Sequence, residues 1–412
     1  MESKNIAGQV LVRETNISSV LRLIYNEAPI SRAQLAGRTG LNKSTISSLV
    51  EDLLDQKLVH EAGVNSTGTG RPATLLEINP KAGCIVGVEL GVDFVAVVLT
   101  DFLGQILWRK QISADPAASM EKTLDQTLAL AEEAKHISHD MKLPLFGLGL
   151  ATPGTVNLNE GVLIFAPNLC WRDVPFRKIF SEATDLKVFV ENDANAAAIA
   201  EHLFGTARQL KDFIFVFAGV GLGGGLFLNG ELYRGKNGYA GEIGHSPIMA
   251  EAVQNPCHCG NRGCWETYAN QYSILRRVHA RLEVKRSSVI PAMLVEENAP
   301  LSIALIKKAA DAGDSEAINS FAEAGTAMGQ GFAVMVNFFN PEKIILGGPL
   351  SLAGDYLLPS IRKTVSLRSL PEINQQVDIG LSVFGPDASL IGAAAIVVDD
   401  ILRNPTHIER RR

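Results

Sequence analysis

The chain has 412 residues, of which 46% are hydrophobic and 20% charged, and its formal net charge is −6 at pH 7. This length allows two or three domains with substantial cores, and the composition excludes a disordered chain. The chain lacks a basic segment followed by an apolar one at its start, and glycine and polar residues interrupt its longest uncharged stretches, 213–230 and 324–341. We therefore expect no secretion signal, no membrane insertion and a cytoplasmic location.

Residues 1–80 are electrically balanced, with eight Lys and Arg and eight Asp and Glu. The negative charge thus belongs to the rest of the chain, and it does not exclude nucleic acid as a partner of this segment.

The same segment follows a pattern of helix, short helix, turn and helix. Apolar residues at helical spacing predict a first helix over 16–25. Ser31, followed three residues later by Gln34, predicts a capping box at the start of a short helix, 32–37. After a glycine turn, Asn42 is expected to cap a third helix. The apolar side chains that this helix would bury are Ile46, Leu49, Val50, Leu53 and Leu54. This order is typical of a helix-turn-helix domain.

The third helix offers a small polar face for DNA. Its first residues would touch base edges, so the predicted DNA contacts are Lys43, Ser44, Thr45, Ser47 and Ser48. A protein-binding face would instead expose aromatic or long apolar side chains. A helical packing module without a ligand is the alternative.

Two strands at 58–61 and 74–78 indicate the winged variant of this domain. The loop between them contains Arg71, held extended between a glycine and a proline and suited to a narrow minor groove.

Beyond a short linker at 79–81 the chain alternates β-rich and helical segments. Three β-rich runs, 84–90, 94–100 and 105–111, are separated by turns. A similar pattern of strands and turns recurs over 213–233. This recurrence suggests a duplicated architecture, with two α/β lobes facing each other across a cleft. Helices are expected at 119–138, 194–204, 301–312, 315–338 and 390–402, and further strands at 145–150, 188–190 and 343–346.

A cluster of soft ligands indicates a metal site. Three of the five cysteines lie within eight residues, namely Cys257, Cys259 and Cys264. With His245 they form the ligand set of a closed, structural Zn²⁺ site. Reduced core cysteines are the alternative, and His258 is a possible substitute ligand. We prefer His245 because the glycines of 241–244 give it a turn of its own. The metal loop would also hold Glu242 and Glu266 in place.

The winged helix-turn-helix, the segments 166–169, 191–195 and 241–245, and the cysteine cluster together resemble the ROK family of sugar kinases and sugar-responsive repressors, over nearly the whole chain. The resemblance implies an actin-like, ribonuclease H-like fold of two lobes with a sugar in the cleft. It also implies that the residues holding sugar hydroxyls are Asn168, Asn192, Asp193, Glu242, His245 and Glu266, with Asp193 as the general base in a kinase member. Carboxylates and amides suit this role because they can bond several neighbouring hydroxyls. Asn192 and Asp193 could equally cap the helix that follows them.

The segments that would bind phosphate depart from the kinase pattern. Glu89 stands where ROK kinases carry Asp, Val92-Asp93 stands where they carry Gly-Thr, and Val220 replaces a threonine in the second loop. The Asp93 carboxylate would repel a triphosphate. These departures favour a regulator over an enzyme.

The sequence thus predicts an α/β protein with an N-terminal winged helix-turn-helix followed by a two-lobed actin-like fold. The expected domains are 1–80 for DNA, 81–195 completed by 386–412 for the first lobe, and 196–385 for the second lobe, with the zinc loop and an oligomerisation surface. The functional hypothesis is a sugar-responsive repressor of a carbohydrate-utilisation operon, such as one for xylose, that binds operator DNA as a homodimer or dimer of dimers. The alternatives are an ATP-dependent sugar kinase and a regulator controlled by docking to a sugar-transport protein.

Overall fold

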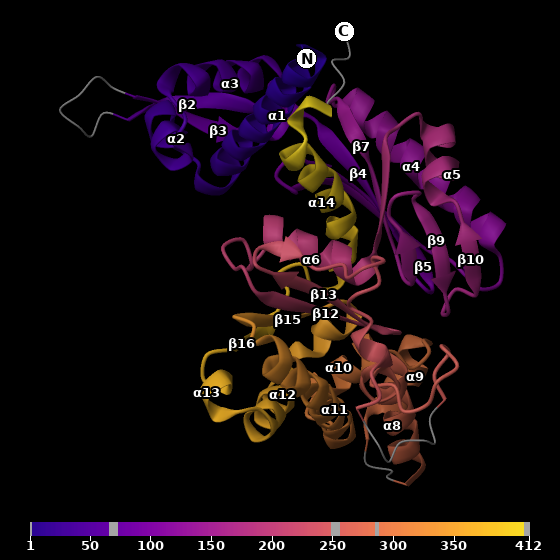
Figure 1. The fold of residues 1–412 in the computed structure, drawn as a ribbon. Coiled ribbons are helices and arrows are strands. Elements are labelled where there is room, and N and C mark those ends of the chain that lie inside the picture. The colour runs from indigo at the N-terminus through magenta and orange to yellow at the C-terminus, as the bar shows by residue number, and fades with distance from the viewer. Residues whose placement is uncertain (1, 66–72, 249–255, 285–287, 408–412) are drawn as a thin grey trace.

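The computed structural model describes residues 2–65, 73–248, 256–284 and 288–407. An N-terminal unit of helices and a small sheet is followed by two larger parts, each built on a five-stranded sheet (Figure 1). We call these parts the first lobe, at the upper right of Figure 1, and the second lobe, below it.

The N-terminal unit has the expected order of elements. Its helices and strands are α1 (Glu2–Glu27), β1 (Ile30–Ser31), α2 (Arg32–Thr39), α3 (Lys43–Asp55), β2 (Val59–Asn65) and β3 (Ala73–Ile78), with the sheet order β1-β3-β2. The capping box is confirmed, since the Gln34 N–H donates to Ser31 Oγ (3.3 Å) and the Ser31 N–H donates to Gln34 Oε1 (2.9 Å). The Asn42 side chain caps α3 by accepting from the Thr45 N–H (2.8 Å). Leu54 is only partly buried, whereas the other four apolar side chains expected in the core are buried.

Two expected bounds in this unit are corrected. The helix α1 starts far upstream of residue 16, and β2 continues to Asn65 through residues that were expected in the loop. Arg71 lies outside the described residues.

The two larger sheets share one topology. The first contains β4 (Cys84–Leu90), β5 (Phe94–Asp101), β6 (Ile106–Ser113), β7 (Leu145–Thr152) and β11 (Val188–Asn192) in the order β11-β7-β4-β5-β6. The second contains β12 (Phe213–Ala218), β13 (Leu222–Leu228), β14 (Glu231–Leu232), β15 (Lys343–Gly347) and β16 (Asp378–Leu381) in the order β14-β13-β12-β15-β16. In each, three consecutive antiparallel strands are followed by two strands parallel to the first. The expected duplication is therefore confirmed at the level of topology.

Helices cover both sheets. The first lobe carries α4 (Met120–Asp140) and α5 (Phe176–Thr184), and a hairpin sheet of β8 (Thr155–Asn157), β9 (Val162–Ala166) and β10 (Trp171–Val174). The second lobe carries α7 (Glu266–Ala269), α8 (Gln271–Val284), α9 (Ile290–Glu297), α10 (Ile303–Asp311), α11 (Ser315–Phe339), α12 (Gly354–Arg368) and α13 (Pro371–Asn374). Short 3₁₀ turns are η1 (Pro80–Ala82), η2 (Ile243–His245), η3 (Pro349–Ala353), η4 (Gly385–Asp387) and η5 (Pro405–His407). None of the helices in the described part of the chain is long and apolar enough to cross a membrane.

A pair of helices, α6 (Asp193–Leu203) and α14 (Ala388–Arg403), lies between the two sheets (Figure 1). α14 packs on β4 and β7 of the first sheet, and α6 packs on β12 and β13 of the second. Small residues bring the two helices close together: a Cβ built on Gly392 would lie 2.2 Å from the Ala196 carbonyl group. One buried apolar cluster continues from the N-terminal unit through this pair into both sheets.

This close contact can be tested with Gly392→Ala. Alanine favours a helix by up to about 1 kcal/mol, but the added methyl group would force the α6 and α14 backbones apart. We expect the free energy of unfolding to fall by about 2 kcal/mol, as for other overpacked cores. Gly37→Ala in α2 is the matched control, because a Cβ there meets nothing outside its own helix within 4 Å. If chemical denaturation found the two variants equally stable, the close helix contact would be wrong.

Candidate functional site

A cavity of about 380 Å³ lies between the lobes, a size typical of small-molecule sites. It is bounded by the turn after β4, the β9–β10 turn, the start of α6, the glycine-rich turn between β12 and β13, and the segment from η2 to α7. All of the residues expected to hold sugar hydroxyls line it: Asn168, Asn192, Asp193, Glu242, His245 and Glu266. The structure therefore brings together side chains that are far apart in the sequence.

The junction of β11 and α6 supplies two of these residues. Asn192 is the cap of α6, since its Oδ1 accepts from the N–H groups of Ala194 (2.9 Å) and Asn195 (3.2 Å). Asp193 is the first residue of the helix, so the expectation that it could itself be the cap is wrong. Beneath them, buried Glu191 accepts from the Asn192 N–H (3.0 Å) and pairs with Arg234 (2.7 Å). Sequence reasoning missed this ion pair, which helps to fix the turn.

Three carboxyl groups that line the cavity have raised pKa values. Burial, together with the nearby Glu242 carboxylate, raises the pKa of Asp193 to about 7. Burial, followed by the charge of Asp193, raises the pKa of Glu89 to about 8. The pKa of Glu242 is also raised, mainly by burial. Near neutral pH Asp193 and Glu89 can therefore either donate to or accept from a hydroxyl group.

The four expected metal ligands come together beside the cavity. The ligand atoms of His245, Cys257, Cys259 and Cys264 all lie within 4.8 Å of one another. The sulfur atoms of Cys259 and Cys264 are 3.8 Å apart, and His245 Nδ1 is 3.6 Å from Cys257 Sγ. A tetrahedral Zn²⁺ with bonds of about 2.3 Å to sulfur and about 2.0 Å to nitrogen has ligand separations of about 3.8 and 3.5 Å. The cluster therefore fits a metal of this size, and His258 is not one of its members.

Without a cation the thiols of Cys257 and Cys264 are held neutral. Burial raises the pKa values of Cys257 and Cys264, the former also through its hydrogen bond to Glu266 (2.8 Å). A divalent cation acts in the opposite direction, because coordination deprotonates a thiol.

His245 faces both the cluster and the cavity. Its Nδ1 points to Cys257, whereas its Nε2 lies 3.7 Å from a carboxylate oxygen of Glu242. A metal on Nδ1 would leave Nε2 as an N–H donor toward the cavity. The two roles expected for this residue, metal ligand and hydroxyl contact, are geometrically compatible.

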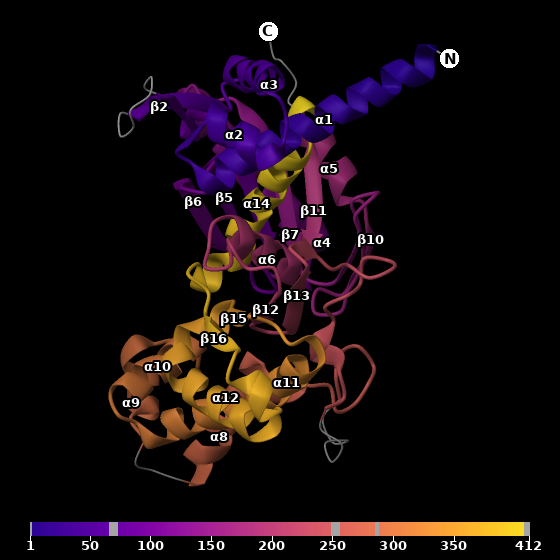
Figure 2. The same ribbon diagram turned by 60° about the vertical axis from the view of Figure 1, so that its left-hand side comes forward.

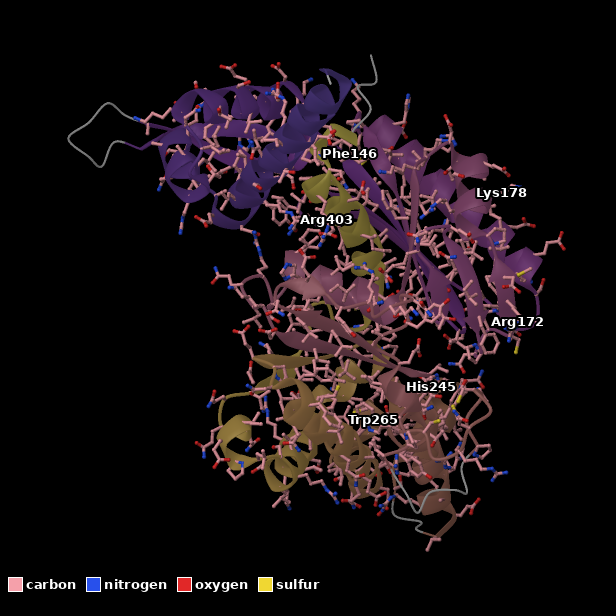
Figure 3. All side chains as sticks on the ribbon, in the orientation of Figure 1. Phe146, Arg172, Lys178, His245, Trp265 and Arg403 are labelled. Atoms are coloured by element: carbon pink, nitrogen blue, oxygen red, sulfur yellow. The ribbon has the colours of Figure 1, made fainter. Side chains whose placement is uncertain are left out.

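Trp265 anchors the end of the metal loop (Figure 3). It is almost fully buried, its indole N–H donates to the Ala327 carbonyl of α11 (2.8 Å), and its backbone N–H donates to the Ser246 carbonyl (3.0 Å). Its chain neighbours, Cys264 and Glu266, thereby reach the cluster and the cavity respectively.

The expected DNA contacts lie on α3, remote from the cavity. Lys43 and Ser44 are exposed, whereas Thr45, Ser47 and Ser48 are partly buried. Of the segments considered for phosphate, the turns that carry Val92, Asp93 and Val220 also line the cavity, and the Asp93 side chain is exposed.

Comparisons with known proteins agree with this arrangement. A sequence model described as ROK family matches residues 85–400. The putative xylose repressor of Caldicellulosiruptor sp. is 31% identical over 404 residues, which cover 98% of this chain and all of the relative. The DNA-binding transcriptional dual regulator NagC of Escherichia coli is 30% identical over 388 residues, which cover 94% of this chain and 93% of the relative.

Solved structures are similar as well. A ROK family transcriptional regulator, a homologue of the E. coli MLC protein, has a TM-score of 0.81 at 30% identity and covers 95% of this chain and 97% of its own. A ROK family glucokinase from Streptomyces griseus, in complex with glucose and AMPPNP, has a TM-score of 0.68 at 30% identity and covers 76% of this chain and 99% of its own. These similarities confirm the predicted α/β fold, with an N-terminal helix-turn-helix unit and two actin-like lobes.

The metal cluster yields a direct prediction. Cys259→Ser should lose bound metal and lower the melting temperature, because three ligands hold a structural metal less tightly than four. Elemental analysis of the purified protein should find close to one zinc per wild-type chain. Cys170→Ser is the matched control, since Cys170 is exposed and outside the cluster. Wild-type protein without zinc, or Cys259→Ser with a full equivalent, would refute the assignment.

Proposed function

The chain belongs to the ROK family, and we propose that it is a transcriptional repressor whose affinity for operator DNA is controlled by a sugar bound between its lobes. The observation that carries this proposal is the extent of the similarities. The glucokinase is matched over 99% of its own length but covers only 76% of this chain, whereas the regulator covers 95%. The part of this chain that the glucokinase does not cover includes the N-terminal helix-turn-helix.

The N-terminal unit is suited to operator DNA. Asn42 fixes the start of α3, and Lys43 and Ser44 lie exposed at the helix end that enters the major groove in this class of domain. A homodimer, or a dimer of dimers, would present two α3 helices to a palindromic site. The cluster of three cysteines and one histidine supports a structural Zn²⁺ as the bound metal.

The cavity is suited to a monosaccharide. Its polar residues come from both lobes, so a sugar that bridges them would favour a closed arrangement over an open one. Xylose and N-acetylglucosamine are the first sugars to test, because the relatives carry the names xylose repressor and NagC.

Helix α6 offers a short route from the sugar to the DNA-binding unit. It begins at the cavity with Asp193, and at its other end the Leu203 carbonyl accepts from the Tyr25 hydroxyl of α1 (3.4 Å). The Arg208 guanidinium donates to the Tyr25 carbonyl (3.1 Å) and lies over the tyrosine ring, 5.6 Å from its centre. α14 runs beside α6 to the same place, where Ser18 donates to the Leu402 carbonyl (2.8 Å; Figure 2). A shift of this helix pair on lobe closure would move α1 as well.

A sugar kinase is the second candidate. It is favoured by Asp193, whose pKa of about 7 suits a general base. Against it stands the exposed carboxylate of Asp93 at the position where the phosphates of ATP would approach. We therefore propose that the chain is not an enzyme. ATP-dependent phosphorylation of a hexose by the purified protein would reverse this choice.

The DNA contact is tested by Lys43→Ala. Loss of one phosphate contact should weaken operator binding and reduce the slope of log K against log salt by about 1. Lys178→Ala is the matched control, because Lys178 is exposed on α5 at the outer edge of the first lobe (Figure 3). The measurement is operator binding by fluorescence anisotropy at several salt concentrations. Identical slopes for the two variants would remove Lys43 from the interface.

Sugar control is tested by Asp193→Ala and Glu266→Ala. Each removes a cavity carboxyl group, so both variants should bind operator but respond little to sugar. The wild-type response should correspond to a coupling free energy of about 1 to 3 kcal/mol, with operator DNA lowering sugar affinity by the same factor. Glu182→Ala, at an exposed carboxylate on α5, should respond like the wild type. If Asp193→Ala kept the full response, the effector site would lie elsewhere; if the wild type responded to no sugar, control by a docked transport protein would gain support.

A further inference from the structure

A side-chain hydrogen bond joins the metal loop to the first lobe at the cavity. His258 Nδ1, between the ligands Cys257 and Cys259, lies 3.0 Å from Asn168 Oδ1 in the β9–β10 turn. Both residues line the cavity. We propose that His258 is a positioning residue that turns the Asn168 amide toward the sugar. This inference rests on the proposed sugar site and assigns one of its determinants.

In the structure this hydrogen bond leaves the nitrogen end of the Asn168 amide facing the cavity. In the structure the amide oxygen faces His258, and because an amide oxygen only accepts, the tautomer that fits this orientation donates from Nδ1. With Oδ1 held by His258, Nδ2 is directed into the cavity as a donor. An unrestrained asparagine could present either end, because the two ends have nearly the same shape.

The position of Nδ2 matches that of an acceptor from the second lobe. A Cβ built on Gly221 would lie 3.5 Å from Asn168 Nδ2 and 3.4 Å from Glu266 Oε2. A donor of the first lobe and an acceptor of the second thus face the same space beside Gly221. A sugar hydroxyl there can accept from the amide and donate to the carboxylate at once. A flipped Asn168 would instead place two acceptors around that hydroxyl.

Hydrogen bonds within the metal loop fix the backbone on both sides of His258. The Gly260 N–H donates to the Cys257 carbonyl (3.0 Å), and the Cys259 N–H donates to Cys257 Sγ (3.5 Å). The backbone on both sides of His258 is therefore tied to the cluster, although its own side chain is exposed. An ordered metal loop therefore holds His258 in place, and His258 in turn holds the Asn168 amide of the first lobe.

The test is sugar binding by isothermal titration calorimetry with xylose, glucose and N-acetylglucosamine. His258→Ala should raise the dissociation constant of the bound sugar about tenfold, as expected for one lost hydrogen bond that orders a binding group. His258→Asn should restore binding to within about threefold of wild type, because an Asn Nδ2 occupies nearly the place of the His Nδ1 donor. Elemental analysis should find the same metal content in all three proteins.

A double-mutant cycle separates positioning from direct contact. In an Asn168→Ala background, His258→Ala should cause no further loss, because there is no amide left to orient. The inference is overturned if His258→Ala binds sugar like wild type, or if it loses the same factor in both backgrounds. Wild-type protein that binds none of the three sugars would overturn the proposed sugar site itself, and this inference with it.

Discussion

The contact between α6 and α14 is the constraint on which the rest of the structure depends. Each of these helices serves a different sheet, and they approach so closely that Gly392 has no room for a side chain beside Ala196. Because interiors packed at this density shift as units rather than deform continuously, the pair is a stiff link between the lobes. It also extends past the lobes to α1, where Tyr25 and Ser18 bond to the last turns of α6 and α14. In the proposed repressor, the ligand between the lobes and the N-terminal DNA-binding unit can therefore influence one another through α6 and α14.

The metal cluster plays the corresponding part inside the second lobe. In its described residues, 246–248 and 256–265, the loop from η2 to α7 contains no helix and no strand, and a loop of this kind loses much conformational entropy when it is ordered. A metal held by these four ligands would offset that loss by tying the loop to one point, and buried Trp265 fixes its end against α11. The carboxylates of Glu242 and Glu266 then reach the cavity from opposite sides of His245. A structural metal can in this way determine the geometry of a binding site without touching the ligand.

Much of the fold could be predicted because its signals are local. The caps at Ser31 and Asn42 act over three residues, and the five helices expected after residue 81 all occur within two residues of their expected ends. Two of the strands that were missed, and one of the helices, lack such signals. The strands β8 and β10 are only three and four residues long, and α12 contains Pro359, which usually indicates the end of a helix. In the site, the cysteine spacing predicted the members of the cluster that the structure brings together, and the resemblance predicted the residues that line the cavity. The partner of His258 could not be predicted, since Asn168 lies 90 residues away and only the closure of the cavity brings them together.

The cavity also explains how a sugar kinase fold can serve a regulator. The cavity keeps an aspartic acid, Asp193, whose pKa of about 7 would suit a base, whereas the turn after β4 carries the exposed carboxylate of Asp93. The Asp93 carboxylate would repel a triphosphate but leave a neutral sugar unaffected. The proposed repressor catalyses no reaction on the sugar, so its hydrogen bonds to the sugar serve only for binding. The same binding free energy can instead shift the equilibrium between open and closed lobes, and it does so only to the extent that the closed form binds the sugar more tightly. Fold alone does not separate these two uses of one site; in the proposed repressor the separation comes from the Asp93 carboxylate beside the cavity and from the DNA-binding unit at the other end of α6.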